Sequence, residues 1–323
     1  MKRILDVTLM AALLVFASPH AVAAQTYPER PVRFIIPFSP GGGADTSARI
    51  VTRKMVVSLG QQIVIDNRGG AGGNVAAKLA AEAPADGYTL LYSNVGSTIS
   101  TTLYRELPYN LLKDFAPVSL LMTTPFALVI NPSVPAQSLR ELIALAKSKP
   151  GDLTFASSGY GGPSHMAAEL FKAAAGLNIR HVPYKGAGPA ARDVVAGRVN
   201  MQFGSVAATK AFVDSGRMRA LAIAATRRSP ILPDVPTASE AGLPGFETGT
   251  WFGVSVPTGA PPAVIKRLHA EFVAALNAPE VRVALEKLAF ELVGNSPEEY
   301  GAFLRKEIAK YAKVIRDQNI RLQ

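Results

Sequence analysis

Several features that this chain lacks narrow its possible functions. It has no cysteine among its 323 residues, which excludes disulfides, thiol nucleophiles and cysteine metal ligands. Beyond the N-terminal segment, no apolar run reaches the roughly 20 residues that a membrane-spanning helix needs. Only three histidines remain there, His165, His181 and His269, and no pair has metal-ligand spacing. We therefore expect a soluble protein that needs neither a metal nor an organic cofactor.

The chain also lacks a concentrated basic patch. Lys and Arg total 34 against 24 Asp and Glu, a formal net charge of +10, but the basic residues stand singly or in pairs. A nucleic-acid binder more often shows a basic cluster with aromatic residues beside it. We expect no nucleic-acid partner, and a basic surface that attracts anions.

The first residues have the organisation of a secretory signal peptide. Lys2 and Arg3 form a positive start, residues 4–17 are mostly apolar, and Ala21-Val22-Ala23 offers the small residues that a signal peptidase accepts. The apolar run is too short to cross a bilayer. The sequence therefore predicts a cleaved signal peptide over residues 1–24 and a periplasmic protein.

The remaining length of about 300 residues exceeds one typical domain and favours two lobes. β-rich runs alternate with glycine loops and helical segments, which predicts an α/β fold with mostly parallel strands flanked by helices. Expected strands cover residues 32–38, 62–66, 88–93, 126–130, 153–157, 179–182, 200–204, 220–224 and 251–256. Expected helices cover residues 46–59, 75–83, 138–149, 165–175, 189–196, 261–276, 279–288 and 297–318.

A strand, a glycine loop and a helix occur in this order near residue 40 and again near residue 160. Two lobes that each offer one such corner would form a clamp. We predict a discontinuous first domain, residues 25–123 plus 225–323, a second domain over residues 124–224, and a ligand cleft between them.

These corners have the chemistry of an anion site. Helix N-termini carry unpaired amides and partial positive charge, and glycine lets a ligand approach the backbone closely. A carboxylate can therefore be held by backbone N–H groups without arginine. Catalytic patterns are missing: residues 41–46 lack the Lys-Ser/Thr ending of a phosphate-binding loop, and no Gly-x-Ser-x-Gly elbow exists.

Three side chains near the corners allow more than one role. His165 either donates to a ligand oxygen or bonds the backbone at the start of its helix. Asp45 either accepts an amine or a water at the cleft or, more simply, caps its own helix. Phe38 belongs either to the core or to an apolar wall of the cleft.

The ordered motifs resemble the Bug solute receptors, the extracytoplasmic binding proteins of tripartite tricarboxylate transporters. The motifs are Pro37-Phe38-Ser39-Pro40-Gly41-Gly42 with Asp45, Asn67-Arg68 before Gly70-Ala71-Gly72-Gly73, Asp86-Gly87-Tyr88-Thr89-Leu90-Leu91, Ser158-Gly159 through His165, His181-Val182-Pro183-Tyr184-Lys185-Gly186, Pro233-Asp234-Val235-Pro236-Thr237 and Glu240-Ala241-Gly242. The match covers nearly the whole chain beyond the signal peptide.

The resemblance implies a type II-like periplasmic binding-protein fold, a carboxylate ligand held by backbone amides and waters, permease subunits as membrane partners, and a monomer. The ligand-binding positions that it implies are Ser39, Gly41 and Gly42 in one lobe and Ser158, Gly159, Gly161, Ser164, His165, Ala187 and Gly188 in the other. The family often has proline where Ser39 and Gly69 stand, and Tyr160 falls where size and polarity help to choose the ligand.

Two other functions stay open at this point. A secreted hydrolase or isomerase would use His165 with Ser164 or Asp45, which requires a base held within reach of a nucleophile by a third group. A signalling receptor would dock a sensor protein in place of a permease.

Overall fold

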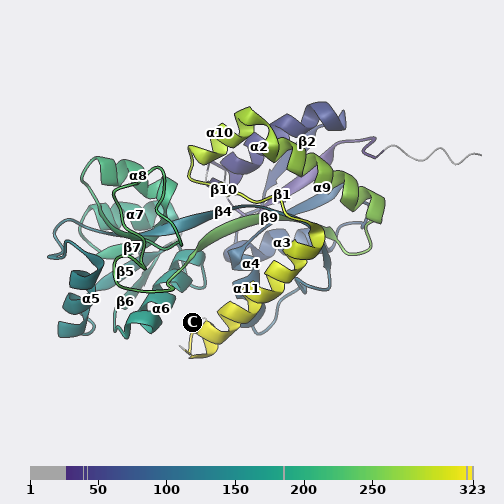
Figure 1. The fold of residues 1–323 in the computed structure, drawn as a ribbon. Helices are drawn as coiled ribbons and strands as arrows, with labels where there is room; N and C mark the ends of the chain where they lie inside the picture. Colours follow the sequence, from purple (N-terminus) through teal and green to yellow (C-terminus); the bar gives the residue numbers. More distant parts are fainter. Residues whose placement is uncertain (1–26, 39, 42, 185, 318, 322–323) are drawn as a thin grey trace, which may run out of the picture.

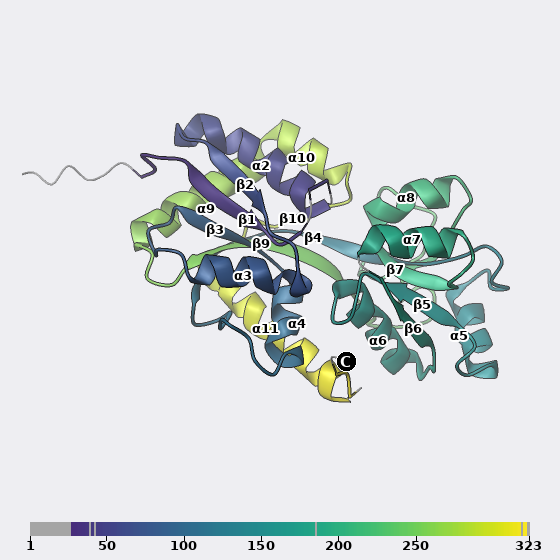
Figure 2. The same cartoon turned by 180° about the vertical axis from the view of Figure 1, so that it is seen from behind.

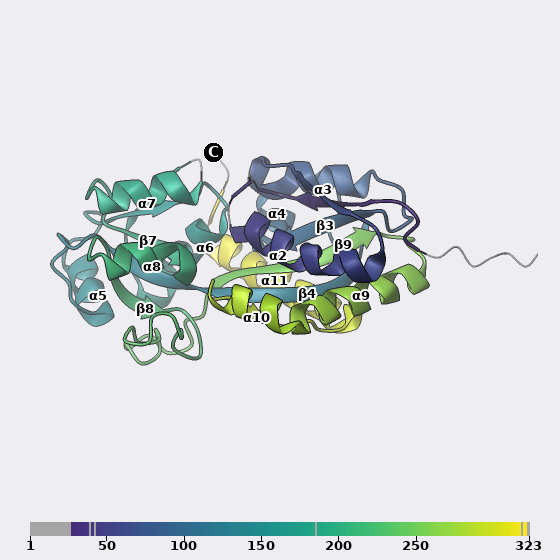
Figure 3. The same cartoon turned by 90° about the horizontal axis from the view of Figure 1, so that it is seen from above.

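The protein is elongated and consists of two α/β halves joined by long strands (Figure 1). This computed structural model describes residues 27–321 except 39, 42, 185 and 318, so the predicted signal peptide lies outside the described residues. Two strands, β4 (Phe115–Ile130) and β9 (Gly249–Pro257), run along the axis of the molecule between the halves (Figure 3). Within the described residues, no helix combines the length and apolar character that crossing a membrane requires.

The first half is built on strands in the order β2-β1-β3-β9-β4. Its parallel strands are β1 (Val32–Ile36), β2 (Ile63–Asn67) and β3 (Thr89–Asn94). One face is covered by α2 (Gly43–Leu59), α9 (Pro262–Asn277) and α10 (Pro279–Glu286), and the other by α3 (Asn74–Ala81), α4 (Val95–Leu103) and α11 (Pro297–Asp317) (Figure 2).

Strand β1 shows why this half has helices on both faces. Phe34 and Ile36 belong to the core under α2 and α9, whereas Ile35 belongs to the core under α3, α4 and α11. A central parallel strand is buried on both faces and therefore reads as a continuous apolar run, as this one does.

The second half repeats the layered plan on a smaller scale. Its strands are β5 (Thr154–Ser157), β6 (Arg180–Pro183), β7 (Met201–Ser205) and β8 (Arg219–Ile223). Its helices are α5 (Leu139–Ser148), α6 (Pro163–Ala175), α7 (Ala187–Val195) and α8 (Val206–Asp214). Strand β5 pairs in parallel with β6 and β7, and the end of β4 pairs antiparallel with β7 and β8.

The predicted two-lobed α/β fold is thus confirmed, with mixed sheets. Parallel pairing holds within β2–β1–β3 and within β6–β5–β7, and these groups include β1 and β5, which lead into the two glycine corners. Pairing around β4 and β9 is antiparallel, and the short strand β10 (Glu291–Leu292) joins β4 in the same way. The mixture arises because β4 and β9 carry the chain from one half to the other in opposite directions.

Strand β4 is much longer than the expected run of residues 126–130. Residues 115–125 pair with β9, and residues 126–130 pair with β7 and β8. Pro117 and Pro125 within it hide the strand in the sequence, since proline cannot donate to a ladder. Pro117 lies at a register shift, where this loss is tolerated.

The chain returns to the first half through β9. Before it, Leu243 and Phe246 of the irregular segment still pack in the core of the second half. The domain limits predicted from the sequence stay a prediction, but this packing favours a second crossing within β9, beyond residue 224.

Candidate functional site

The first glycine corner connects β1 to α2. Gly41 has a φ of +83°, and its N–H donates to Asp45 Oδ2 over 2.9 Å. Asp45 also accepts hydrogen bonds from Arg49 Nε at 3.0 Å and from Asn67 Nδ2 at 3.1 Å. Helix α2 begins at Gly43, so Asp45 lies in its first turn and is not the N-cap that the sequence predicted.

The hydrogen bonds of the Asp45 carboxylate therefore stabilise the corner. Its side chain is almost fully buried. Burial raises the pKa of this carboxyl, but the hydrogen bonds from Arg49, Gly41 and Asn67 outweigh burial and hold the pKa below its ordinary value. Asp45 fixes the loop by accepting from the backbone, which leaves little capacity to bind an amine ligand.

Of the other residues predicted for this corner, Phe38 lies within the described part of the chain. The Phe38 carbonyl accepts from Asn67 Nδ2 at 3.0 Å, and the partly buried Phe38 ring packs against the core under α2. Ser39 and Gly42 lie outside the described residues, so their predicted contacts with a ligand stay predictions.

A second glycine loop of the first half lies next to this corner. A Cβ atom on Gly73 would lie 3.1 Å from Pro37 Cβ, and one on Gly96 would lie 2.9 Å from the Gly72 carbonyl oxygen. At the start of α4, Asn94 Oδ1 accepts from Gly96 N–H at 2.7 Å. The N-termini of α2, α3 and α4 therefore gather at the carboxyl edge of the parallel strands.

In the second half, the corner between β5 and α6 is closed by two serines. Ser158 N–H donates to Ser164 Oγ at 2.9 Å, and the two hydroxyl oxygens are 3.0 Å apart. Gly161, with a φ of +68°, donates its N–H to His165 Nδ1 at 3.1 Å. His165 thus bonds the backbone through Nδ1, the second of the two roles that the sequence left open.

The loop between β6 and α7 lies beside this corner. Gly186 N–H donates to the Ser158 carbonyl at 3.1 Å, and a Cβ atom on Gly159 would lie 3.2 Å from the Tyr184 carbonyl oxygen. Ala187 and Gly188 are exposed in the first turn of α7, where backbone amides have no intrahelical partner. Most of the residues predicted for the second lobe are thus brought together.

A stack of aromatic rings packs within this corner. Phe155 and His181 stack with centroids 4.7 Å apart, and His181 stacks on His165 at 4.1 Å. The Tyr160 ring meets both imidazoles edge-on, at 4.8 and 5.7 Å. Ser157 Oγ lies 2.6 Å from His181 Nε2. The sequence offered no sign of the roles of Phe155 and Ser157, and it did not place His181 among the ligand-binding residues.

Both imidazoles are held in the neutral form. Burial, then His181 and Lys172, lower the pKa of His165 to about 3. Burial, then the Lys172 ammonium, lower the pKa of His181 to about 4. Neither ring carries a charge near neutral pH.

The bonds of these side chains do not form a catalytic triad. Ser164 bonds Ser158, His165 bonds Gly161, and Asp45 bonds Arg49. Ser157 and His181 form a Ser–His pair, but Ser157 is 1% exposed. Within the described parts of the chain, no three histidine or acidic side chains are grouped to hold a metal ion. The arrangement is suited to binding an anion by backbone amides.

The second-half corner also touches the first half. A Cβ atom on Gly161 would lie 2.1 Å from Leu103 Cδ2, at the end of α4. Met166, one turn into α6, is fully buried in the core of the first half. The corner between β5 and α6 therefore lies at the boundary of the two halves.

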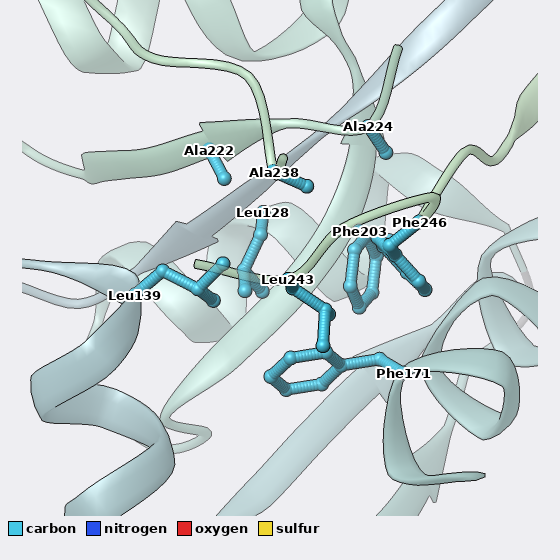
Figure 4. A pocket seen from close by; sticks show the side chains of 9 residues that line it. All are labelled: Leu128, Leu139, Phe171, Phe203, Ala222, Ala224, Ala238, Leu243 and Phe246. Atoms are coloured by element: carbon cyan, nitrogen blue, oxygen red, sulfur yellow. The ribbon is translucent and has the colours of Figure 1, made fainter. Parts of the chain in front are cut away.

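Two hollows lie away from the corners. One is an apolar gap in the core of the second half, between Leu128, Phe171, Phe203 and their neighbours, and it is too tight for a water molecule (Figure 4). The other, of about 330 Å³, opens on the first half beside the end of α4 and includes Tyr104, Arg105 and Ile308 in its lining. Neither is formed by the carboxyl ends of the parallel strands, where open α/β sheets bind ligands.

Comparison with known families gives a match over most of the chain. Residues 47–320 match the model of the tripartite tricarboxylate transporter family receptor. A protein from the tcbD-tcbE intergenic region of Pseudomonas sp. strain P51 is 41% identical, over 95% of this chain and 91% of that protein. Protein BugT of Bordetella pertussis is 38% identical over 98% of both chains.

Solved structures of similar proteins include ligand complexes. Rpa4515 of R. palustris with adipate is 36% identical, with a TM-score of 0.85 over 91% of this chain and 99% of that one. MatC of Rhodopseudomonas palustris with bound malate is 34% identical, with a TM-score of 0.81 over 90% of this chain and 100% of that one.

Proposed function

Because this chain belongs to the receptor family of the tripartite tricarboxylate transporters, we propose that it captures a small carboxylate between its two halves. Members of this family are extracytoplasmic solute-binding proteins, and this chain is a solute-binding receptor. The family resemblance predicted from the sequence motifs is thereby confirmed.

One observation carries the proposal for the site: each half has a corner in which a positive-φ glycine leads into a helix N-terminus. The first-turn amides of α2, α6 and α7 are donors that need no charged side chain to hold an anion. The residues that we assign to the ligand site are Phe38, Ser39, Gly41, Gly42, Ser158, Gly159, Tyr160, Gly161, Ser164, Ala187 and Gly188. Asp45 and His165 do not contact the ligand in this proposal. They accept hydrogen bonds from Gly41 and Gly161 and so hold these two glycines in position.

The bound acids of the similar structures suggest the ligand class. Adipate and malate are both short dicarboxylates, and the proteins that bind them are 36% and 34% identical to this chain. We propose a dicarboxylate of similar length for this receptor. Tyr160 is 39% exposed at the second corner and is the side chain that we expect to select among such acids.

We further propose a route for the bound acid. The signal peptide is removed, the receptor works as a monomer in the periplasm, and the halves close around the ligand by bending at β4 and β9. The closed form then docks on permease subunits. Delivery to a sensor protein is the alternative, and a pull-down with ligand-saturated receptor distinguishes the two. Catalysis is not favoured, because Ser164, His165 and Asp45 bond other groups than one another.

The proposal is tested by ligand screening with the purified chain lacking residues 1–24. Malate, succinate, adipate and benzoate should be compared with an amine and a neutral sugar of similar size. A true ligand at 100 times its Kd stabilises the folded state by about 2.7 kcal/mol, which a thermal shift detects and calorimetry then quantifies. If no carboxylate in a broad panel raises the unfolding temperature, the proposed function is wrong.

A further inference from the structure

The two corners share a hydrogen-bond arrangement that their sequences do not reveal. Gly41 donates its N–H to Asp45, and Gly161 donates its N–H to His165, in each case to the side chain four residues later. Both glycines have positive φ, +83° and +68°, and each helix begins two residues after its glycine, at Gly43 and Pro163. Asp45 and His165 therefore occupy equivalent positions.

The hydrogen bond determines the protonation of His165. Because Nδ1 accepts from Gly161 N–H, it carries no proton, and the single ring proton is on Nε2. Nε2 faces Glu169 Oε1 at 3.7 Å. A proton on Nδ1 would turn the acceptor into a donor and break its bond to Gly161.

His181 fixes the other glycine of the corner through Ser157. Gly159 N–H donates to Ser157 Oγ at 3.1 Å, and the Ser157 hydroxyl lies 3.2 Å from the Gly159 carbonyl. With its proton on Nε2, His181 donates to Ser157 Oγ, and the Ser157 hydroxyl donates in turn to the Gly159 carbonyl, so that each of these protons has an acceptor. His181 Nδ1 is buried without a partner among the described residues, so an added proton there would find no acceptor.

The charges that face the stacked imidazoles are already paired. Glu169 is 6% exposed and binds Lys172 Nζ through both carboxylate oxygens at 2.9 Å. Burial and the positive charge of Lys172 both oppose protonation of His165 and His181. Asp45, the equivalent of His165, is negative, but Arg49 compensates its charge.

We propose that His165 is a positioning residue of the ligand site, whose neutral imidazole sets the second corner by accepting from Gly161 and adds no negative charge beside a bound anion. Asp45 does the same for Gly41, with Arg49 supplying the compensating charge. This inference rests on the proposed capture of a carboxylate.

Three substitutions of nearly equal shape separate the parts of the proposal. H165N places a neutral acceptor where Nδ1 was, H165L has no acceptor, and H165D has an acceptor with a negative charge. All three lose the ring stack equally. We expect H165L to bind adipate or malate about tenfold more weakly than H165N, the equivalent of about 1.4 kcal/mol. H165D should also bind about tenfold more weakly than H165N at low salt, and this difference should shrink in high salt because salt screens the added charge.

Calorimetry gives the affinities, and unfolding temperatures show whether each variant is folded. Equal affinities of H165N and H165L would overturn the role of the acceptor, and equal affinities of H165N and H165D at low salt would overturn the role of neutrality.

A measurement without ligand tests the hydrogen bond between Gly161 and His165. Nitrogen-15 NMR of the wild-type chain should show His165 protonated on Nε2 alone. Both H165N and H165L lose the ring, so their Gly161 amides are compared with each other: the amide proton should exchange faster with solvent in H165L, which lacks an acceptor, than in H165N. A proton on Nδ1 in the ligand-free protein at pH 7 would overturn the proposal. If no carboxylate binds the wild type, the proposed function fails, and the NMR result still decides whether His165 holds the corner.

Discussion

At the scale of residues, the second corner contains a glycine whose backbone conformation and surroundings both disfavour a side chain. Gly161 combines a φ of +68° with Leu103 Cδ2 at 2.1 Å from the position of its missing Cβ. Gly176, at the other end of the same helix, has a similar φ of +64° and nothing within 4 Å of its missing Cβ. The two glycines therefore separate backbone strain from steric contact.

We expect G161A to weaken carboxylate binding about tenfold or more, since Leu103 must move and the corner with it. G176A is the matched control: a left-handed alanine costs roughly 1–2 kcal/mol of stability and should leave affinity unchanged. Calorimetry and denaturant unfolding of both variants check this. Equal affinity losses in the two variants would contradict a special role of the Gly161–Leu103 contact.

Single residues also show which roles can be predicted from the sequence and which cannot. The glycines, Ser158 and Ser164 could be assigned to the corner because they are contiguous and their chemistry is local. Ser157, Asn67 and Phe155 could not, because their roles arise from contacts between segments far apart in the chain, such as Asn67 with Asp45. The role of His165 stayed open for a different reason: its partner Gly161 is only four residues away, but their hydrogen bond depends on the loop conformation.

At the scale of elements, the crossing strands β4 and β9 place one half against the other. They pair closely where Pro125 faces Gly249, and a Cβ atom on Gly249 would lie 2.4 Å from the Thr124 carbonyl oxygen. Helix α4 is an element that sequence patterns missed. Its segment VGSTISTTL is rich in β-branched and hydroxyl residues of modest helix propensity, but Asn94 caps it and the core of the first half buries it.

We expect G249A to destabilise the protein by about 1–3 kcal/mol, because an added methyl group must push the two crossing strands apart. G301A in α11 is the control, since its Cβ would make only ordinary contacts, 3.5 Å from Pro117 Cγ. Removing a glycine from a helix interior should stabilise the protein by about 0.5–1 kcal/mol. Urea unfolding measures both, and a G249A variant as stable as the wild type would show that the crossing strands tolerate separation.

At the scale of the whole molecule, the buried imidazoles link stability to pH. Unfolded histidine has an ordinary pKa of 6.5, whereas His165 titrates at about 3 and His181 at about 4 in the folded protein. Between pH 6.5 and 4 the unfolded chain binds protons that the folded chain does not. The stabilisation is therefore complete above pH 6.5 and is lost progressively as the pH falls.

We expect the free energy of unfolding to decrease as the pH is lowered from about 6.5 to about 4, with a smaller slope in the H165N/H181F double variant. Urea unfolding across this range measures the slope. Asp45, whose pKa is also lowered in the folded protein, adds to the slope near pH 4, but it is present in both proteins, so the difference in slope between them reports the two histidines. Identical slopes in the wild type and the double variant would contradict the assignment to the two histidines.

The sequence by itself determined the chemistry class of this protein. Glycine corners, helix starts and the lack of cysteine are local features, so the α/β class, the receptor family and the proposal of anion binding at the glycine loops follow from contiguous residues. Only the tertiary structure decided which partners those residues have. The mixed sheets and the strand through Pro117 and Pro125 depend on pairing between distant segments, which local patterns do not encode. The acceptor roles of Asp45 and His165 span only four residues each, but they depend on the positive-φ loop conformation that the surrounding fold holds in place.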